Sequence, residues 1–288
     1  MEQSAWRFSD DRGQLSKASA TPSRVVAYIQ AGATLEDLGI RPAAVFGSFH
    51  DDVEAPDPAK TGALPRGEVG YLGAGGGLTV DTLLSAGPDL VVAVSYGGGQ
   101  VYGLDPEVAK HLEERVPVAV LEVGQDRSLA HIRGRFADLA RSLGAPEEDT
   151  GTLTDAEERL RAVAARAPRP RVLALSPAGP DQVHIARPQA WPELRGLTGY
   201  GVDLIEPEAG PGANWLTGSW EQAAGLRPDI VLADIRCNAA PLDTLGCNAS
   251  WRALERGARV VAWNPESPGS ARAHAAFLST VADALEGV

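Results

Sequence analysis

One stretch of the sequence occurs twice, and it limits the folds that this chain can adopt. The copies, Asp81–Ala93 and Glu221–Ala233, each place an acidic residue seven positions before a Pro-Asp pair and then a short apolar run. We interpret each copy as a helix followed by a buried strand, because proline disfavours helical backbone at the residue before it. The acidic residue lies in the first helical turn, where the helix dipole favours negative charge.

The repetition extends on both sides of the two copies. Apolar runs at 24–28 and 171–175 precede them, and runs at 116–121 and 258–263 follow. Each half therefore predicts strand, helix, strand, helix, strand in one order. Alternation of this kind, in a chain of 288 residues, predicts an α/β fold with two similar Rossmann-like lobes and mostly parallel sheets.

The segment between the halves has the pattern of a helix. Apolar residues from Ala156 to Ala167 follow helical spacing with charged residues between them, and no Gly/Ser linker interrupts the run. We therefore predict an N-terminal lobe at 1–148, a single long connecting helix at 149–168 and a C-terminal lobe at 169–288.

Local signals predict several details of each lobe. We expect a short helix at 33–39, a long polar loop from Gly47 to Gly70 and a flexible glycine-dense loop at 73–77. Thr79 and Ser219 fit the N-cap position of the two repeated helices. In the second lobe we expect a loop at 206–217 that carries Trp215.

Charge and composition exclude several classes of partner. A net charge of −12 argues against nucleic acid or an anionic membrane as a partner, and no run of ~18 apolar residues predicts a membrane-spanning helix. The N-terminus lacks the pattern of a signal peptide. We therefore expect an extracytoplasmic protein if a leader was removed, and a cytoplasmic protein otherwise.

The two cysteines leave two readings open. Cys237 and Cys247 lie in one loop-like stretch of the second half and could close a small disulfide loop, or they could be two thiols. No histidine cluster stands near them, so we expect no metal site.

Motifs of catalysis are missing from the sequence. There is no Walker-type loop, no Gly-x-Ser-x-Gly elbow and no His-Glu-x-x-His, and the glycines at 73–77 lack the Gly-x-Gly-x-x-Gly spacing. We therefore expect a protein that is not an enzyme, with no catalytic residues and no cofactor of its own.

Aromatic and basic residues gather in the loops that should follow the strands. Ligands of α/β proteins bind outside the carboxyl ends of the strands, and aromatic rings with guanidinium groups suit an anionic or aromatic ligand. Alternatively, some of these rings pack in the core, Trp191 and Trp263 above all, and Tyr28 could pack under a loop. The candidates are Arg187, Arg236, Trp215 and Tyr96, followed by Tyr28, Phe49, His50, Tyr102, Trp191 and Trp263.

The order of several short motifs resembles one family. The stretches 6–13, 22–27 and 78–89, continuing to 251–260, resemble ABC-transporter substrate-binding proteins for ferric siderophores, vitamin B12 and haem. The resemblance implies two α/β lobes joined by one long helix, with a ligand cleft between them. It also implies a monomer that captures a metal chelate, most often a ferric siderophore, and hands it to a permease. Cobalamin or haem is the alternative cargo, and an intracellular enzyme or metal-chelate handler on this fold is an alternative of another class.

The same resemblance suggests a role for the two repeated acidic residues. In such proteins a glutamate at the top of each lobe docks onto arginines of the permease. The matching residues here are Asp81, which departs from glutamate, and Glu221. The alternative is that both side chains only complement the dipoles of their helices, each contributing ~0.3–1 kcal/mol.

Overall fold

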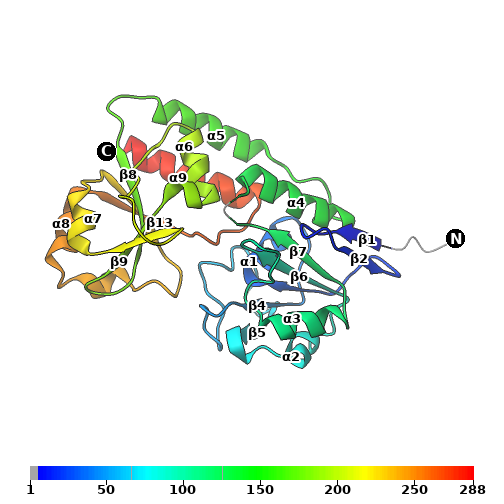
Figure 1. The fold of residues 1–288 in the computed structure, drawn as a ribbon. Coiled ribbons are helices and arrows are strands. Elements are labelled where there is room, and N and C mark those ends of the chain that lie inside the picture. The colour runs from blue at the N-terminus through cyan, green and yellow to red at the C-terminus, as the bar shows by residue number, and fades with distance from the viewer. Residues whose placement is uncertain (1–5, 66, 125) are drawn as a thin grey trace. The chain divides into compact units, whose positions relative to one another are not determined.

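The computed structural model describes residues 6–65, 67–124 and 126–288. They form two compact units, shown in Figure 1. Unit 1 extends to Asp149 and includes Glu266–Ala273, whereas unit 2 consists of Thr150–Pro265 and His274–Val288. Residues 266–273, which the sequence analysis places in the second lobe, therefore belong with unit 1.

Unit 1 is built on a five-stranded parallel sheet with the order β5-β4-β3-β6-β7. Strands β3, β4 and β6 are buried along their whole length, as expected for a parallel sheet with covered faces. The flexible loop expected at 73–77 is wrong at its start, because strand β5 extends to Ala74. The strand itself is not predicted, since two glycines in its five residues hide the strand pattern. The strands are β3 (Val25–Tyr28), β4 (Ala44–Gly47), β5 (Gly70–Ala74), β6 (Leu90–Ser95) and β7 (Val118–Glu122).

The helices of unit 1 form two contacting pairs, α1 with α4 and α2 with α3 (Figure 1). Helix α1 begins four residues before the expected start at residue 33. Its first turn contains Gly32, which lowers helix propensity but is required by packing, since a Cβ there would lie 2.5 Å from Val45 Cγ1. The elements are α1 (Ile29–Asp37), α2 (Val80–Leu84), α3 (Pro106–Glu113) and α4 (Leu129–Ser142), with the hairpin β1 (Trp6–Ser9) and β2 (Leu15–Ala18) and the 3-10 turn η1 (Gly75–Gly77).

Unit 2 has a six-stranded mixed sheet. Strands β8, β12 and β13 are parallel, β9 and β11 run antiparallel to their neighbours, and β10 pairs with β8. The expected loop at 206–217 is therefore wrong at its end, because Trp215 begins β11. The strands are β8 (Arg171–Pro177), β9 (Val183–Ala186), β10 (Asp203–Leu204), β11 (Trp215–Gly218), β12 (Ile230–Asp234) and β13 (Arg259–Trp263).

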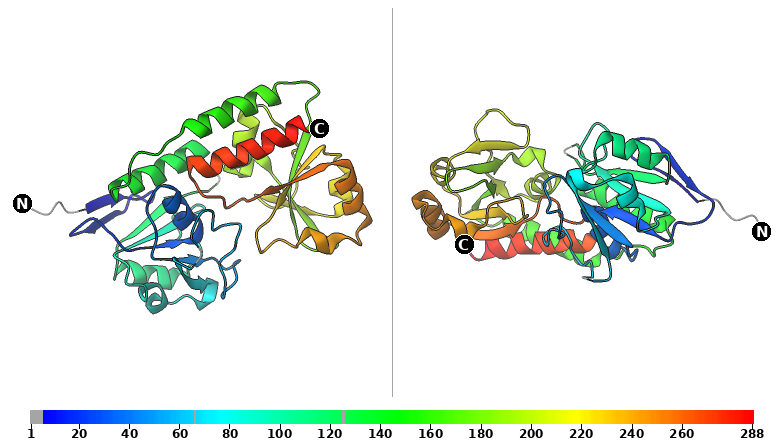
Figure 2. Two further views of the ribbon diagram at one scale, coloured as in Figure 1. Left: turned by 180° about the vertical axis from the view of Figure 1, so that it is seen from behind. Right: turned by 90° about the horizontal axis from the view of Figure 1, so that it is seen from below.

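The helix expected at 149–168 is α5, which groups with unit 2. Within that unit α5 lies beside α9, as Figure 2 shows, and Arg159 pairs with Asp283 at 2.6 Å. No helix in the described part of the chain is long and apolar enough to span a membrane. The helices are α5 (Gly151–Ala164), α6 (Pro192–Gly199), α7 (Trp220–Gly225), α8 (Ala249–Gly257) and α9 (Ala271–Glu286), with the 3-10 turns η2 (Pro188–Ala190) and η3 (Leu242–Leu245).

The two copies of the repeat are built alike. Thr79 accepts a hydrogen bond from the Thr82 amide at 3.1 Å, and Ser219 accepts one from the Gln222 amide at 3.2 Å, so both predicted N-caps are confirmed. Helix α2 leads to β6 and helix α7 leads to β12, as predicted. The α/β class with two lobes and mostly parallel sheets is thereby confirmed.

The aspartate of each Pro-Asp pair fixes the start of the neighbouring strand. Asp89 accepts the Arg24 amide at 2.8 Å, at the start of β3, and Asp229 accepts the Arg171 amide at 2.7 Å, at the start of β8. Each arginine side chain in turn donates to a carbonyl at the end of the repeated helix. These contacts satisfy carbonyls that the helix leaves unpaired, and they connect helix and sheet in both units.

Candidate ligand-binding site

Three tyrosines meet where two strands of the unit 1 sheet end. Tyr28 is the last residue of β3, and Tyr96 directly follows β6. The Tyr102 ring lies edge-on to both, with centroid distances of 5.5 Å to Tyr28 and 4.7 Å to Tyr96. Tyr28 is fully buried, whereas the other two are partly exposed. We call Tyr28, Tyr96 and Tyr102 the tyrosine cluster. The sequence predicts each of them as a ligand-binding residue, but it does not predict that they contact one another.

The turn after β4 presents two further predicted residues, Phe49 and His50, both exposed. Ser48 fixes this turn, because its amide and hydroxyl donate to Asp51 Oδ2 at 2.7 and 2.8 Å. Gly75, at a φ of +56°, lies against it: a Cβ there would be 3.0 Å from the Phe49 Cα. The exposed phenyl ring therefore rests on closely packed backbone and can offer apolar area to a ligand.

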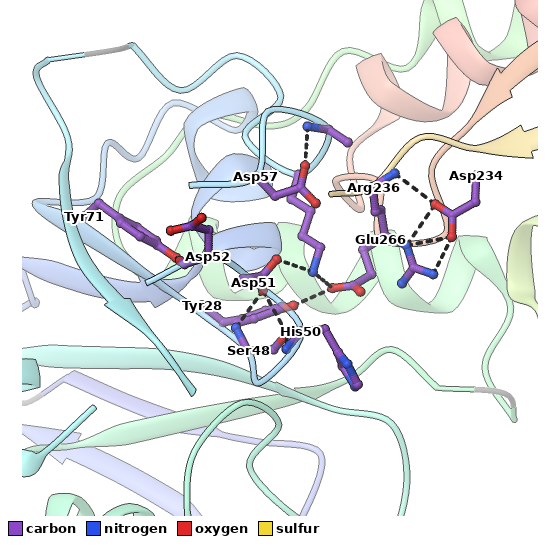
Figure 3. A network of polar contacts seen from close by, with 12 residues as sticks. Tyr28, Ser48, His50, Asp51, Asp52, Asp57, Tyr71, Asp234, Arg236 and Glu266 are labelled. Atoms are coloured by element: carbon purple, nitrogen blue, oxygen red, sulfur yellow. Dashed lines mark hydrogen bonds and ion pairs between the residues drawn. The ribbon is translucent and has the colours of Figure 1, made fainter. Parts of the chain in front are cut away.

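A buried network of charges contacts Tyr28 of the tyrosine cluster (Figure 3). Lys60 Nζ is 2.7 Å from Asp51 Oδ1 and 3.0 Å from Glu266 Oε2, and the Tyr28 hydroxyl donates to Glu266 Oε2. The side chains of Lys60 and Asp51 are 1% exposed and that of Glu266 is 2% exposed. Two carboxylates thus share one buried ammonium group.

This network fixes the hydroxyl of Tyr28 as a donor. Burial, and then the negative charge of Glu266, raise the pKa of Tyr28 well above its ordinary value. The phenol therefore stays protonated at neutral pH. Sequence reasoning did not find Lys60, Asp51 or Glu266, because contacts across so many positions leave no local pattern.

Further hydrogen bonds hold residues 266–273 in unit 1. Gln30 Nε2 donates to the Ser267 carbonyl at 2.9 Å, and the Gly269 amide donates to Thr34 Oγ1 at 2.8 Å. A Cβ at Gly269 would lie 3.0 Å from Ile132, so this position also packs tightly against α4. These contacts explain why the segment groups with unit 1 although it follows the last strand of unit 2.

Three tryptophans form an aromatic cluster in unit 2, as three tyrosines do in unit 1. Trp191 is 4.8 Å from Trp215 and 5.7 Å from Trp263, and Trp215 and Trp263 are 5.8 Å apart, all between ring centroids. Trp191 and Trp263 are buried, so both contribute to packing, as the alternative reading stated. Trp215 is partly exposed, and it is the member of this tryptophan cluster with the most surface for a ligand.

The two predicted arginines already bind protein groups. All three side-chain nitrogens of Arg187 donate to backbone carbonyl oxygens in the range 208–212, at 3.0–3.2 Å. Arg236 forms a two-point ion pair with Asp234, through Nε at 3.0 Å and Nη2 at 2.7 Å. Arg187 therefore supports the loop before β11, and Arg236 is held at the end of β12.

A carboxyl group that sequence reasoning missed lies beside the tryptophan cluster. Glu193 is in the first turn of α6, and its Oε1 atom is buried without a hydrogen-bond partner among the described residues. Burial raises the pKa of Glu193 to about 7, against smaller opposing effects of its own amide, Trp263, Arg236 and Arg195. The indole N–H of Trp263 favours the charged form electrostatically, although its geometry falls short of a hydrogen bond.

A histidine flanks the same cluster. The His184 ring is 6.2 Å from that of Trp215, and its Nδ1 lies 2.9 Å from Thr217 Oγ1. Burial lowers the pKa of His184, so the imidazole is neutral at pH 7. It therefore adds no positive charge to the tryptophan cluster.

The two repeated acidic residues lie on the surface, each in the first turn of its helix. The Asp81 side chain is 91% exposed and pairs weakly with Arg115, at 3.3 Å. It lines a hollow of 520 Å³ with two more acidic residues, Glu107 and Glu114. Glu221 is also exposed. Both are accessible to a partner, and permease docking stays a prediction.

Neither a disulfide nor a metal cluster is found in the described residues. Cys237 and Cys247 are both exposed and are not joined, so a disulfide between them stays a prediction. No group of three or more His, Cys, Asp or Glu side chains in the described ranges is placed to hold a metal ion.

The chain is similar to several solved structures, although it matches no family model and no curated protein. Among solved structures, it is similar to DesE, a ferric-siderophore receptor protein from Streptomyces coelicolor, with 28% identity, a TM-score of 0.87 and 98% of each chain covered.

More distant structures share the fold alone. The haem-binding protein HmuT is 14% identical, with a TM-score of 0.70 over 99% of this chain and 91% of that one. A siderophore periplasmic binding protein from the fuscachelin gene cluster of Thermobifida fusca is 16% identical, with a TM-score of 0.64 over 93% and 98%. These proteins bind ligands and are not enzymes.

The structures that this chain resembles are ligand-binding proteins, which agrees with the expectation that the chain is not an enzyme. More narrowly, the fold of this chain is that of binding proteins for ferric siderophores and haem. The resemblance stated from the sequence is thereby confirmed.

Replacing Lys60 tests the buried network. Lys60→Met removes the ammonium group that pairs with two buried carboxylates, so we expect the free energy of unfolding to fall by about 3–5 kcal/mol. Lys110→Met is the matched control, because Lys110 is exposed and 4.0 Å from Glu107; we expect a change within about 0.5 kcal/mol.

Denaturant unfolding followed by circular dichroism measures both variants. Adding Glu266→Gln to Lys60→Met should restore part of the loss, because it removes one of the two opposed charges. Equal effects of the two lysine variants would show that the network does not stabilise unit 1.

Replacing Glu193 tests its raised pKa. The folded protein keeps a proton on Glu193 up to about pH 7, whereas the unfolded chain releases it near the ordinary value of 4.5. The stabilising effect of this proton is complete below pH 4.5 and is lost as the pH rises to about 7. Relative to Glu193→Gln, the wild type should therefore lose about 3 kcal/mol of unfolding free energy across this window.

Urea unfolding at a series of pH values measures the difference between the two proteins. Glu255→Gln, an exposed site on α8, is the control and should run parallel to the wild type. If Glu193→Gln also runs parallel to it, the Glu193 carboxyl titrates alike in the folded and unfolded chain.

Proposed function

We propose that this substrate-binding protein works outside the cytoplasm and captures a ferric siderophore, which it delivers to the permease of an ABC importer. The observation that carries the proposal is the similarity to a ferric-siderophore receptor over 98% of both chains. At 28% identity that similarity exceeds that of the haem-binding and periplasmic proteins named above.

The residues at the ends of the strands support this cargo. A metal chelate is a bulky ligand with apolar area, and pockets for such ligands use aromatic side chains with a few polar groups. Unit 1 offers the tyrosine cluster and exposed Phe49, and unit 2 offers Trp215. All ten predicted ligand-binding residues remain candidates. Arg187 and Arg236 would act indirectly, because their side chains hold other protein groups in place.

Haem is the second candidate cargo, because HmuT has the same fold. Its 14% identity supports the fold alone, and so haem ranks below a siderophore. Cobalamin is a third cargo that the fold family accommodates.

A titration of ligands tests the proposal. Tryptophan fluorescence should be quenched in a saturable way by one ferric siderophore, because Trp215 is partly exposed beside two buried tryptophans. We expect a dissociation constant of about 1 μM or below, equivalent to about −8 kcal/mol. Haem, cobalamin and the metal-free siderophores are the comparison ligands. Tighter binding of haem or cobalamin would show that this ligand, and not a siderophore, is the cargo. If none of the ligands binds, the proposed function is contradicted.

We also propose that Asp81 and Glu221 dock onto cationic residues of the permease. Both are exposed, both begin a repeated helix, and Glu107 and Glu114 add negative charge beside Asp81. Long-range attraction between opposite charges speeds encounter and fixes register. The Asp81–Arg115 pair is exposed and weak, so it leaves the carboxylate available.

Charge reversal tests the docking residues. The variant with Asp81→Lys and Glu221→Lys should bind the siderophore within about twofold of the wild type, because neither residue belongs to the tyrosine cluster or the tryptophan cluster. Import by membrane vesicles that contain the permease should fall at least about tenfold, as expected for two lost charge contacts. Asp155→Lys, an exposed site on α5, is the control. Undiminished import by the double variant would contradict docking through these residues.

A further inference from the structure

We propose that Arg12 is a positioning residue of the ligand-binding site in unit 1. It holds the tyrosine loop, which we define as residues 96–103 and which carries Tyr96 and Tyr102 of the tyrosine cluster. This inference rests on the proposed function and adds to the site a residue from the N-terminal hairpin, far from the strand ends at which the sequence analysis looked for ligand contacts.

The tyrosine loop is fixed at its C-terminal end but has a glycine-rich centre. The Tyr102 amide donates to the Val94 carbonyl at 2.9 Å, and a Cβ at Gly103 would lie 3.1 Å from the Cα of Ser48. The centre is Gly97–Gly99, with φ values of +129°, +66° and +69°, a region that glycine adopts far more readily than other residues. Because glycine loses the most conformational freedom on ordering, this centre needs contacts from elsewhere to stay in one arrangement.

Arg12 provides such a contact. A Cβ at Gly99 would lie 3.4 Å from Arg12 Cγ and 3.6 Å from its Cδ, whereas a Cβ at Gly97 or Gly98 would meet no described atom within 4 Å. The alkyl part of the arginine therefore lies beside the Gly99 backbone, and its side chain is only 11% exposed. Movement of the loop centre toward the hairpin is thus blocked at Gly99.

Two carboxylates fix the direction of the Arg12 side chain. Its Nε donates to Asp10 Oδ2 at 2.9 Å, and its Nη1 donates to Glu113 Oε1 at 2.5 Å. Asp10 belongs to the turn of the hairpin, whereas Glu113 is the last residue of α3. Charge-assisted hydrogen bonds to two different elements leave the guanidinium little freedom, so the alkyl part stays against Gly99.

The hairpin turn is itself attached to β7, the edge strand of the sheet. The Val120 amide donates to Asp10 Oδ2 at 3.2 Å, and the Glu122 amide donates to Asp11 Oδ2 at 2.8 Å. The Asp11 amide donates to the Val120 carbonyl at 3.1 Å. An edge strand has backbone groups without a strand partner, and the turn pairs with several of them. Strand β7 pairs with β6, which the tyrosine loop follows, so Arg12 connects the loop to a well-anchored part of unit 1.

Holding the loop before the ligand arrives has a specific kinetic consequence. A loop that is already ordered lowers the entropy cost of binding. Without Arg12, a smaller fraction of molecules would have the loop in the binding arrangement, and the apparent dissociation constant would rise in proportion. Association should therefore slow while dissociation is unchanged. Loss of a direct ligand contact acts mainly on dissociation instead.

Hydrogen–deuterium exchange of the ligand-free full chain, read by mass spectrometry, tests the contact between Arg12 and the loop. In Arg12→Ala, amide exchange in 96–103 should become at least about fivefold faster, because the loop opens more easily. Exchange in β7 should stay within about twofold, since Asp10 keeps three backbone amide donors and the hairpin turn remains in place. Arg7→Ala, an exposed site on β1, is the matched control and should change neither segment.

Stopped-flow tryptophan fluorescence tests the effect on binding. The probes are a ferric trihydroxamate and a ferric tricatecholate chelate, each mixed separately with the wild type and the variants. For a chelate that binds the wild type, Arg12→Ala should slow association at least about fivefold and leave dissociation within about twofold. Arg7→Ala should leave both rates as in the wild type.

Glu113→Gln provides a second variant that does not depend on the folding of Arg12→Ala. It weakens one of the two anchors of Arg12, so it should change loop exchange and association in the same direction by a smaller factor, about twofold. Unchanged loop exchange in both variants would overturn the inference. Faster dissociation at an unchanged association rate would also overturn it, because Arg12 would then be a ligand contact. Both results leave the proposed function standing. If neither chelate binds the wild type, the proposed function fails, and the role of Arg12 in binding fails with it.

Discussion

The ion pairs of Lys60 are the interaction on which the architecture of unit 1 depends. One buried ammonium group joins Asp51, from the loop after β4, to Glu266, from the segment after the last strand of unit 2. Tyr28 connects the same carboxylate to the end of the central strand. Because a buried charge without a partner is far more costly than an exposed one, loop, strand end and returning segment have to form together.

Cationic side chains near the aromatic clusters are likewise bound by other protein groups. Arg236 is held by Asp234, Arg187 is held by carbonyl oxygens, and Lys60 is held by two carboxylates. Side chains that a sequence would assign to ligand recognition instead order the loops that present the rings. The strand ends of each unit also present aromatic area, which is the kind of surface that pockets for bulky ligands use.

Local patterns predicted the parts of the structure that depend on local physics. The Pro-Asp repeat gave both helix–strand units and the caps at Thr79 and Ser219, because proline, capping hydroxyls and apolar runs act within a few residues. Strand β5 and Trp215 in β11 were missed, since short, glycine-containing edge strands carry little pattern of their own. The start of α1 was missed because Gly32 serves packing against Val45 rather than helix propensity.

The sequence by itself determined the class of fold, the two-lobed plan and the candidate aromatic residues, because these follow from periodicity and from the rule that parallel strands end at one edge. Only the tertiary structure decided which charged side chains are bound to other groups of the protein. Whether an arginine binds a ligand or a neighbouring carboxylate depends on distances of about 3 Å between atoms, as for Arg236 and Asp234. Glu266 meets Lys60 across most of the chain, and no local pattern encodes such a contact.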